Sequence, residues 1–165
     1  MTAIEIKQID YRDPQHAADL MMLLNAYAQD PMGGEQALDP DTLATLPAKL
    51  AELPTAFCLI AYVTAAGQTQ PVGLINCFYG FSTFAAKPLI NIHDVTVLPA
   101  FRGMGVSQKM LARVESIAHE NGCCKLTMEV LSSNAVAMKA YAKFGFGSYE
   151  LNRETGHAVC WQKNL

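Results

Sequence analysis

Two glycines stand where an apolar strand is expected to turn into a helix. Residues 95–107 read VTVLPAFRGMGVS, and Gly103 and Gly105 come directly before a helical pattern. Glycine lets backbone N–H groups approach a ligand without a Cβ in the way. A helix N-terminus adds unpaired donors and about half a positive charge, so the turn could bind a pyrophosphate, with Arg102 as a further cation. On the glycines alone, an ordinary strand-to-helix turn is the simpler interpretation.

A histidine and an aspartate are adjacent in the strand that leads to this turn. The reference pKa of histidine is about 6.5, so His93 could accept a proton at neutral pH. Side chains alternate along a strand, so only one of His93 and Asp94 is expected to face a cleft unless a bulge intervenes. A half-buried strand histidine bonded to backbone is an equal alternative for His93. Asp94 could instead fix the loop or hold a substrate ammonium.

Hydrophobic periodicity and breaker residues predict the elements that position these groups. Alternating apolar residues predict strands at residues 3–10, 56–64, 70–82, 88–97, 124–131, 146–151 and 157–163. Helical spacing and Asp-Pro or glycine boundaries predict helices at residues 14–29, 40–51, 105–120 and 134–143. The order β-α-α-β-β-β-α-β-α-β-β predicts a mixed α/β sheet in one domain, residues 1–165, without a linker or repeat.

The composition is that of a folded, charge-poor domain. Hydrophobic residues make up 51% of the 165 residues, and charged residues make up 16%, below the usual share of about 25%. Such a chain is not expected to be disordered. The charge-free run at residues 53–86 is interrupted by prolines and glycines, so it predicts two buried strands and their turn rather than a membrane span.

The net charge of −3 is divided unevenly along the chain. Residues 1–86 hold nine acids and three bases, which gives −6, and residues 87–165 hold six acids and nine bases, which gives +3. The total does not supply the basic footprint expected of a nucleic-acid-binding domain. An uneven division can indicate two different ligand surfaces.

The five cysteines form no C-x-x-C pair, and their number is odd. This pattern favours free thiols in a reducing cytoplasm and gives no support for a metal site. Glu5 and Lys7 lie within an alternating segment, so the N-terminus does not resemble a signal peptide.

Two motifs resemble those of the GNAT superfamily of N-acetyltransferases. Residues 102–107, RGMGVS, are similar to its Arg/Gln-x-x-Gly-x-Gly/Ala signature, with Ser107 where the family usually has Gly or Ala. Asn134 followed by residues 141–146, YAKFGF, is similar to its Asn…Tyr-x-x-x-Gly-Phe segment. The resemblance covers nearly the whole chain and implies a GNAT-type mixed, mostly antiparallel central sheet flanked by helices.

A narrower resemblance points to the diamine and spermidine/spermine acetyltransferase branch. Residues 78–83, FYGFST, and residues 87–95, KPLINIHDV, are similar to that branch, whose fourth strand typically reads Leu-Glu-Asp-Leu. His93 stands in the Glu position and Asp94 in the Asp position. The resemblance implies transfer of acetyl from acetyl-CoA to a polyamine, diamine or amino-acid-like amine, directly in a ternary complex.

The family resemblance also implies roles for individual residues. Tyr141 matches the general acid that protonates the departing thiolate, although a core position is an alternative because Tyr141 shares helical spacing with apolar neighbours. His93 or Asp94 would take the amine proton, directly or through water. The resemblance implies a strand that bulges near Val95 and Val97 and offers backbone N–H groups to the oxyanion. Residues implied to bind acetyl-CoA are Val95, Val97, Arg102, Gly103, Met104, Gly105, Val106, Ser107 and Asn134.

The loop between the first two helices is expected to border the acceptor. Glu35 on this loop and Tyr79 are the implied substrate contacts, and acidic groups there would attract a cationic amine. Asp39 precedes Pro40 at a helix start, so capping is the simpler role for Asp39. The basic part of the sequence would then bind the acetyl donor, and the acidic part would border the amine acceptor.

Two other functions are compatible with the same motifs. One is acetylation of a protein N-terminus or lysine, and the other is a non-catalytic acyl-CoA sensor, because a fold does not guarantee a function. The resemblance also implies a homodimer, and we expect neither nucleic acid nor membrane as a partner.

Overall fold

The computed structural model describes residues 3–149 and 158–165. The chain divides into two units, Met1–Met128 and Glu129–Leu165. The first unit holds the central sheet and helices α1 to α3, and the second unit holds helix α4.

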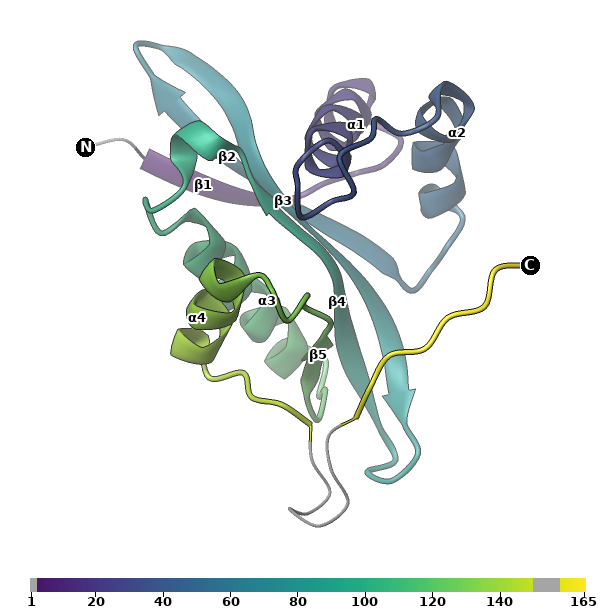
Figure 1. Cartoon of the computed structure of the whole chain (residues 1–165). Helices are drawn as coiled ribbons and strands as arrows, with labels where there is room; N and C mark the ends of the chain where they lie inside the picture. Colours follow the sequence, from purple (N-terminus) through teal and green to yellow (C-terminus); the bar gives the residue numbers. More distant parts are fainter. Residues whose placement is uncertain (1–2, 150–157) are drawn as a thin grey trace. The chain divides into compact units, whose positions relative to one another are not determined.

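Five strands form one sheet in the first unit, in the order β1-β2-β3-β4-β5 (Figure 1). The first four pair antiparallel with their neighbours, and β5 runs parallel to β4. The predicted mostly antiparallel sheet is therefore confirmed. The strands are β1 (Ala3–Gln8), β2 (Ala56–Ala65), β3 (Gln68–Ser82), β4 (Lys87–Val97) and β5 (Leu126–Met128).

Capping residues set the starts of the first two helices. The side chain of Asp13 accepts hydrogen bonds from two backbone N–H groups of α1, and Asp39 does the same for α2. Both helices begin with a proline, which has no N–H to leave unpaired. The helices of this unit are α1 (Pro14–Ala28), α2 (Pro40–Ala51) and α3 (Val106–Glu120), as predicted to within a residue or two.

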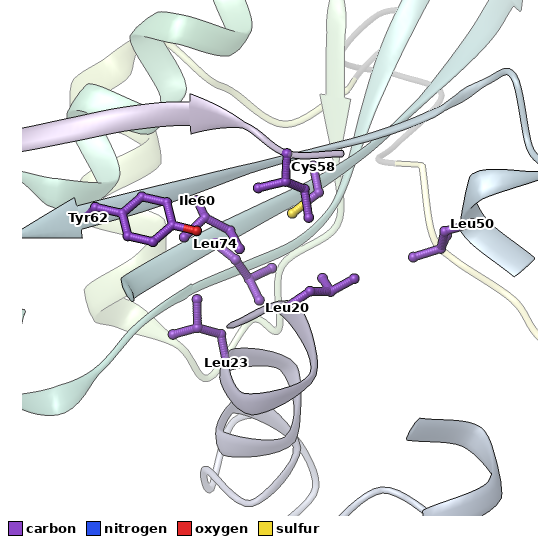
Figure 2. Packing of buried hydrophobic residues seen from close by; sticks show 8 residues of the cluster. Leu20, Leu23, Leu50, Cys58, Ile60, Tyr62 and Leu74 are labelled. Carbon is purple, nitrogen blue, oxygen red and sulfur yellow. The ribbon is translucent and has the colours of Figure 1, made fainter. Parts of the chain in front are cut away.

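The helices cover the sheet from both sides. Alternate residues of β2, namely Cys58, Ile60 and Tyr62, share one apolar cluster with residues of α1 and α2 (Figure 2). Helix α3 covers the other face. Its Met110 lies so close to Gly73 of β3 that a Cβ on Gly73 would be 3.2 Å from the methyl group of Met110. Strand β2 is accordingly buried on both faces, which explains why its sequence carries no charge.

One carboxylate takes part in the cluster between α1 and the sheet. Asp19 is buried and accepts hydrogen bonds from the Tyr62 hydroxyl at 2.8 Å and from the Gln15 amide at 2.9 Å. Burial, followed by the hydrogen bond to Asp19, raises the pKa of the Tyr62 phenol. This polar pair satisfies both partners inside an otherwise apolar layer.

The second unit departs from the prediction after its helix. Asn134 caps α4 (Ala135–Phe144), and Gly145 ends it with a left-handed backbone, φ 109°. The two final strands were expected at 146–151 and 157–163. Residues 146–149 and 158–163 are not in strands, and residues 150–157 lie outside the described residues. Alternation alone was a poor guide here, because side chains such as Trp161 are exposed and gain nothing from a strand conformation.

None of the helices in the described part of the chain combines the length and apolar character that crossing a bilayer requires.

Candidate functional site

The turn after β4 presents its backbone to open space. A short 3-10 helix, Pro99–Phe101, follows the strand, and Gly103 and Gly105 then adopt left-handed conformations with φ 77° and 79°. A Cβ on either glycine would meet no atom within 4 Å, so backbone conformation rather than crowding requires glycine. Gly105 caps α3 without a side chain, so no side-chain acceptor occupies the helix start. This geometry suits an anion.

The side chains around this turn differ in what they could offer. Val106 is buried, so any contact with a ligand would come from its backbone. Ser107 is half-buried in the first turn of α3, and Met104 is exposed. The fit of an anion at this place therefore depends mainly on main-chain N–H groups.

Arg102 is engaged with another part of the chain. Its Nε donates to the Val97 carbonyl oxygen at 3.0 Å, and its Nη2 forms an ion pair with Asp30 Oδ2 at 2.7 Å. The hydrogen bond from Arg102 is the main reason that the pKa of Asp30 is lowered. The guanidinium thus joins the glycine turn to the loop after α1, and the basic and acidic parts of the sequence meet in this pair.

A shallow pocket of about 270 Å³ lies beside this ion pair. The end of α1 and the end of β4 form its walls. Its lining residues are Ala26, Gln29, Asp30, Pro31, Thr96, Val97, Leu98, Pro99 and Arg102.

Strand β4 carries a bulge at His93. Asn76 of β3 pairs with Asp94, whereas the next residue, Cys77, pairs with Ile92. His93 is therefore the extra residue between two regular pairs. The family resemblance implied a bulge near Val95, and the bulge lies two residues before that position.

Because of the bulge, His93 and Asp94 both contact side chains on the same face of the sheet. The His93 ring meets the Phe78 ring edge-on, with centroids 5.5 Å apart and an interplanar angle of 88°. Asp94 Oδ2 accepts a hydrogen bond from Asn76 Nδ2 at 2.9 Å. Asn76 and Phe78 are two residues apart on β3 and so lie on the same face, the one that α1 covers. Without the bulge, adjacent residues would point to opposite faces.

One edge of β4 is open beyond the bulge. Strand β5 pairs with β4 at Ile90, Asn91 and Ile92. After Ile92, no described strand of the first unit pairs with this edge of β4.

Alternation then fixes which backbone groups face the open edge. The Leu98 N–H bonds to β3, at the Val72 carbonyl oxygen. Backbone groups of successive residues point to opposite edges, so those of Val95 and Val97 face the open side. The Arg102 bond to the Val97 carbonyl oxygen agrees with this direction.

Two residues near Asp94 were not anticipated from the sequence. Asn76 is only 5% exposed, and its Oδ1 has no hydrogen-bond partner among the described residues. A buried polar atom without a partner costs about 1–3 kcal/mol. Tyr27 of α1 is half-buried, and its pKa is raised by burial and then by the carboxylates of Asp94 and Asp30. An asparagine inside an apolar strand was the available signal for Asn76, whereas Tyr27 follows the apolar stripe of its helix.

The two predicted acceptor contacts are not both near the bulge. Tyr79 packs on Phe57 at a centroid distance of 5.3 Å, and its pKa is raised by burial and then by Cys123, which follows α3. Tyr79 therefore belongs to the face opposite His93. Glu35 is exposed in the loop between α1 and α2 and has a left-handed backbone, φ 58°.

Two further predicted residues belong to the second unit. Asn134 Oδ1 accepts a hydrogen bond from the Ala137 N–H at 3.1 Å, so its capping role is confirmed. Tyr141 is half-buried, and its ring meets the Phe146 ring edge-on at 6.2 Å. Their roles toward acetyl-CoA and the thiolate stay predictions.

The five cysteines are free thiols, of which Cys58 and Cys77 are buried. Within residues 3–149 and 158–165, no group of three or more His, Cys, Asp or Glu side chains could hold a metal ion.

Solved structures share this fold. The structure described as that of a probable acetyltransferase superposes with a TM-score of 0.79 at 18% identity, covering 97% of this chain and 99% of the other. An aminoglycoside N-acetyltransferase in complex with CoA gives a TM-score of 0.74 at 17% identity, covering 100% and 97%. At these identities the likeness concerns the fold.

Sequence comparison adds the family. The thialysine N-epsilon-acetyltransferase of Bos taurus is 33% identical over 98 residues, which are 57% of this chain and 57% of the relative. The match thus spans little more than half the length of that curated relative. The model of the acetyltransferase (GNAT) family matches residues 20–146, which include the bulge and the glycine turn. The chain belongs to the GNAT acetyltransferase family.

Proposed function

We propose that this protein transfers an acetyl group from acetyl-CoA to a primary amine of a small molecule. The observation that carries the proposal is the bulge of β4, which puts His93 directly before an open strand edge. A group that can take a proton and backbone donors that can receive charge then follow each other in one strand. Acetyl transfer to an amine needs both.

The donor side of the proposal rests on the turn after β4. Acetyl-CoA supplies an acetyl group activated as a thioester. The uncapped start of α3 and the left-handed Gly103 and Gly105 would bind its pyrophosphate. The half-buried Ser107 could add a hydroxyl donor at the first turn.

The reacting carbonyl would lie along the open edge of β4. The N–H groups of Val95 and Val97 point to this edge and would receive the negative charge on the carbonyl oxygen. One such donor is typically worth about 3 kcal/mol in the transition state. Because the strand holds these groups fixed, little reorganisation is needed when charge develops.

Proton transfers complete the reaction. His93 would take the proton of the attacking amine, directly or through water, while the N–C bond forms and the C–S bond breaks. The hydroxyl of Tyr141, in the second unit, would return a proton to the departing thiolate. No covalent acetyl-enzyme is needed, because the amine itself attacks.

The relatives and the charges near the bulge support a small cationic amine as the acceptor. The compared proteins are named for thialysine and for aminoglycosides, which carry amines. Asp94 is half-buried beside His93, and the loop after α1 adds further carboxylates. Such groups favour a cationic small molecule over a neutral one.

A thiol-release assay tests this proposal. Acetyl-CoA is mixed with the protein and with thialysine, lysine, spermidine, an aminoglycoside or a short peptide, each in turn. We expect free thiol to appear only with an amine, and faster with a small amine than with the peptide. Absence of release across the panel, while calorimetry shows CoA binding, would indicate a non-catalytic acyl-CoA-binding protein instead.

The assembly and compartment belong to the same proposal. We expect a homodimer that works in the cytoplasm, where the exposed thiols of Cys124 and Cys160 would stay reduced. Light scattering should give twice the mass of one chain. The mass of a single chain would reject the dimer and leave the activity untouched.

A further inference from the structure

Asn76 occupies a position where a polar side chain does not stabilise the core. It lies in the central strand β3, between Cys58 of β2 and Asp94 of β4. Its amide nitrogen donates to Asp94, but its buried Oδ1 has no partner among the described residues. A well-packed apolar residue would avoid that loss. The asparagine therefore needs an explanation other than stability.

The orientation of the Asn76 amide follows from chemistry. A carboxylate only accepts hydrogen bonds, so the NH₂ group must face Asp94. The reverse orientation would put two oxygens 2.9 Å apart. The bond is therefore a neutral donor on a carboxylate oxygen.

The bond also lies at a decisive place in the sheet. Asn76 and Asp94 form the last regular pair before the register shift. Their side-chain bond holds the Asp94 carboxylate on the face that His93 reaches through its contact with Phe78. Loss of this bond would let the carboxylate rotate away from that face.

The surroundings of Asp94 leave its negative charge uncompensated. Asp94 takes part in none of the ion pairs between described side chains. Asp94 also contributes to the raised pKa values of Tyr27, Cys58 and Cys77, which are therefore neutral neighbours. Among the described side chains, the hydrogen-bond partner of this carboxylate is a neutral amide and not a cation.

We propose that Asn76 is a positioning residue that fixes the Asp94 carboxylate without neutralising it, so that Asp94 binds the ammonium of the acceptor amine next to His93. This inference rests on the proposed acetyl transfer and adds a determinant of acceptor specificity. A lysine or arginine at position 76 would hold Asp94 more tightly but would consume its charge. An apolar residue would leave the charge and lose the placement.

Replacement of Asn76 by leucine tests the proposal, because leucine has a similar shape and no hydrogen bond. In N76L we expect the KM of a cationic acceptor such as lysine or spermidine to rise about tenfold or more, as for a lost hydrogen bond to a charged group. The Kd of CoA, measured by calorimetry, should not change. Thermal unfolding should occur at the wild-type temperature or above, because an unpaired buried oxygen is removed. A purely structural role predicts the opposite, a lower unfolding temperature with an unchanged KM.

A double-mutant cycle shows whether Asn76 acts through Asp94. D94N should raise the acceptor KM at least as much as N76L, and N76L/D94N should resemble D94N alone. Additive effects of the two substitutions would overturn the proposal.

Asn91 provides the matched control. It lies on β4, and its amide donates to the neutral Thr127 hydroxyl at 3.1 Å. Asn91→Leu removes a comparable bond and should leave the acceptor KM within about twofold of wild type. If N76L does not fold, Asn76→Asp serves instead, because a second carboxylate beside Asp94 should raise the pH at which the acceptor binds.

The outcomes separate this inference from the function it rests on. If wild-type protein releases no thiol with any amine, the proposed function fails. If wild-type protein is active and N76L keeps the wild-type acceptor KM, the role of Asn76 fails and the function stands.

Discussion

The glycine turn after β4 and the bulge within β4 lie a few residues apart and are built in different ways. The turn offers backbone groups at a helix start, and its side chains contribute little. The bulge instead presents side chains, and those of His93 and Asp94 of β4 contact Phe78 and Asn76 of β3. The first kind of site tolerates changes in side chains but not in backbone conformation. The second kind responds to single side-chain substitutions, so the two should fail in different ways.

The largest effect is expected from a residue outside both regions. Tyr141→Phe removes the hydroxyl proposed to protonate the thiolate and should lower kcat by about 10²–10⁴. The Kd of CoA and the KM of the amine should stay near wild type. An unchanged kcat in stopped-flow or steady-state assays would mean that the first unit and solvent supply every proton transfer.

His93→Ala should lower kcat by about 10²-fold, because water and buffer can replace an exposed base in part. The pH–rate profile of H93A should differ from that of the wild type. His93→Gln is the matched variant, since it keeps polarity and size near Phe78 but takes no proton. If H93Q is as active as the wild type, His93 is not the base, and the bulge has only a binding role.

Gly105→Ala tests the turn. Alanine with φ near 79° costs about 1–2 kcal/mol, so either the turn rearranges or the protein loses stability. We expect the Kd of CoA to rise about tenfold, with the acceptor KM unchanged. Gly122 at the other end of α3 has φ 65° and equally open surroundings, so Gly122→Ala is the control. Equal loss of CoA affinity in both variants would contradict a phosphate site at the turn.

The smallest effect is expected for the ion pair between Arg102 and Asp30. Because the folded pKa of Asp30 is lowered, the pair stabilises the protein above the unfolded pKa of about 3.9 and is lost as the pH falls through the folded value. Asp30→Asn should reduce the free energy of unfolding by no more than about 1 kcal/mol at pH 7 and by less at pH 3. Urea titrations at both pH values measure this difference. Glu120→Gln, which breaks the more exposed pair with Arg113, should have a smaller effect still.

Most elements through α4 were predictable because each has a local cause. The exceptions are β5, which is Leu126–Met128 where the prediction was 124–131, and the 3-10 helix Pro99–Phe101, which was not predicted. Asp39 and Pro40 start α2, and the strand alternation and apolar stripes give the rest. The glycine turn was predictable for the same reason, because its backbone conformation depends on residues that are adjacent in the sequence.

What the sequence could not predict depends on residues far apart. The bulge is a property of the register between β3 and β4, and no local pattern around His93 shows it. The ion pair of Arg102 with Asp30, which is 72 residues away in the chain, was not predicted, and a contact of Arg102 with acetyl-CoA stays a prediction. The role proposed for Asn76 depends on Asp94, which the sheet places beside it.

The extra residue at His93 also determines which backbone groups of β4 face which edge of the strand. Before it, Pro88 and Ile90 direct their backbone groups toward β5, and after it Val95 and Val97 take that side. If residues 88–97 formed a regular strand without the bulge, alternation from Pro88 and Ile90 would turn the backbone of Asp94 and Thr96, not that of Val95 and Val97, to the open edge. Deletion of His93 would make the pairs of Ile92 and Asp94 with β3 consecutive, so Val95 and Val97 would keep their direction and only the extra side chain would be lost. The one extra residue in β4 therefore decides which backbone groups of the strand face its open edge.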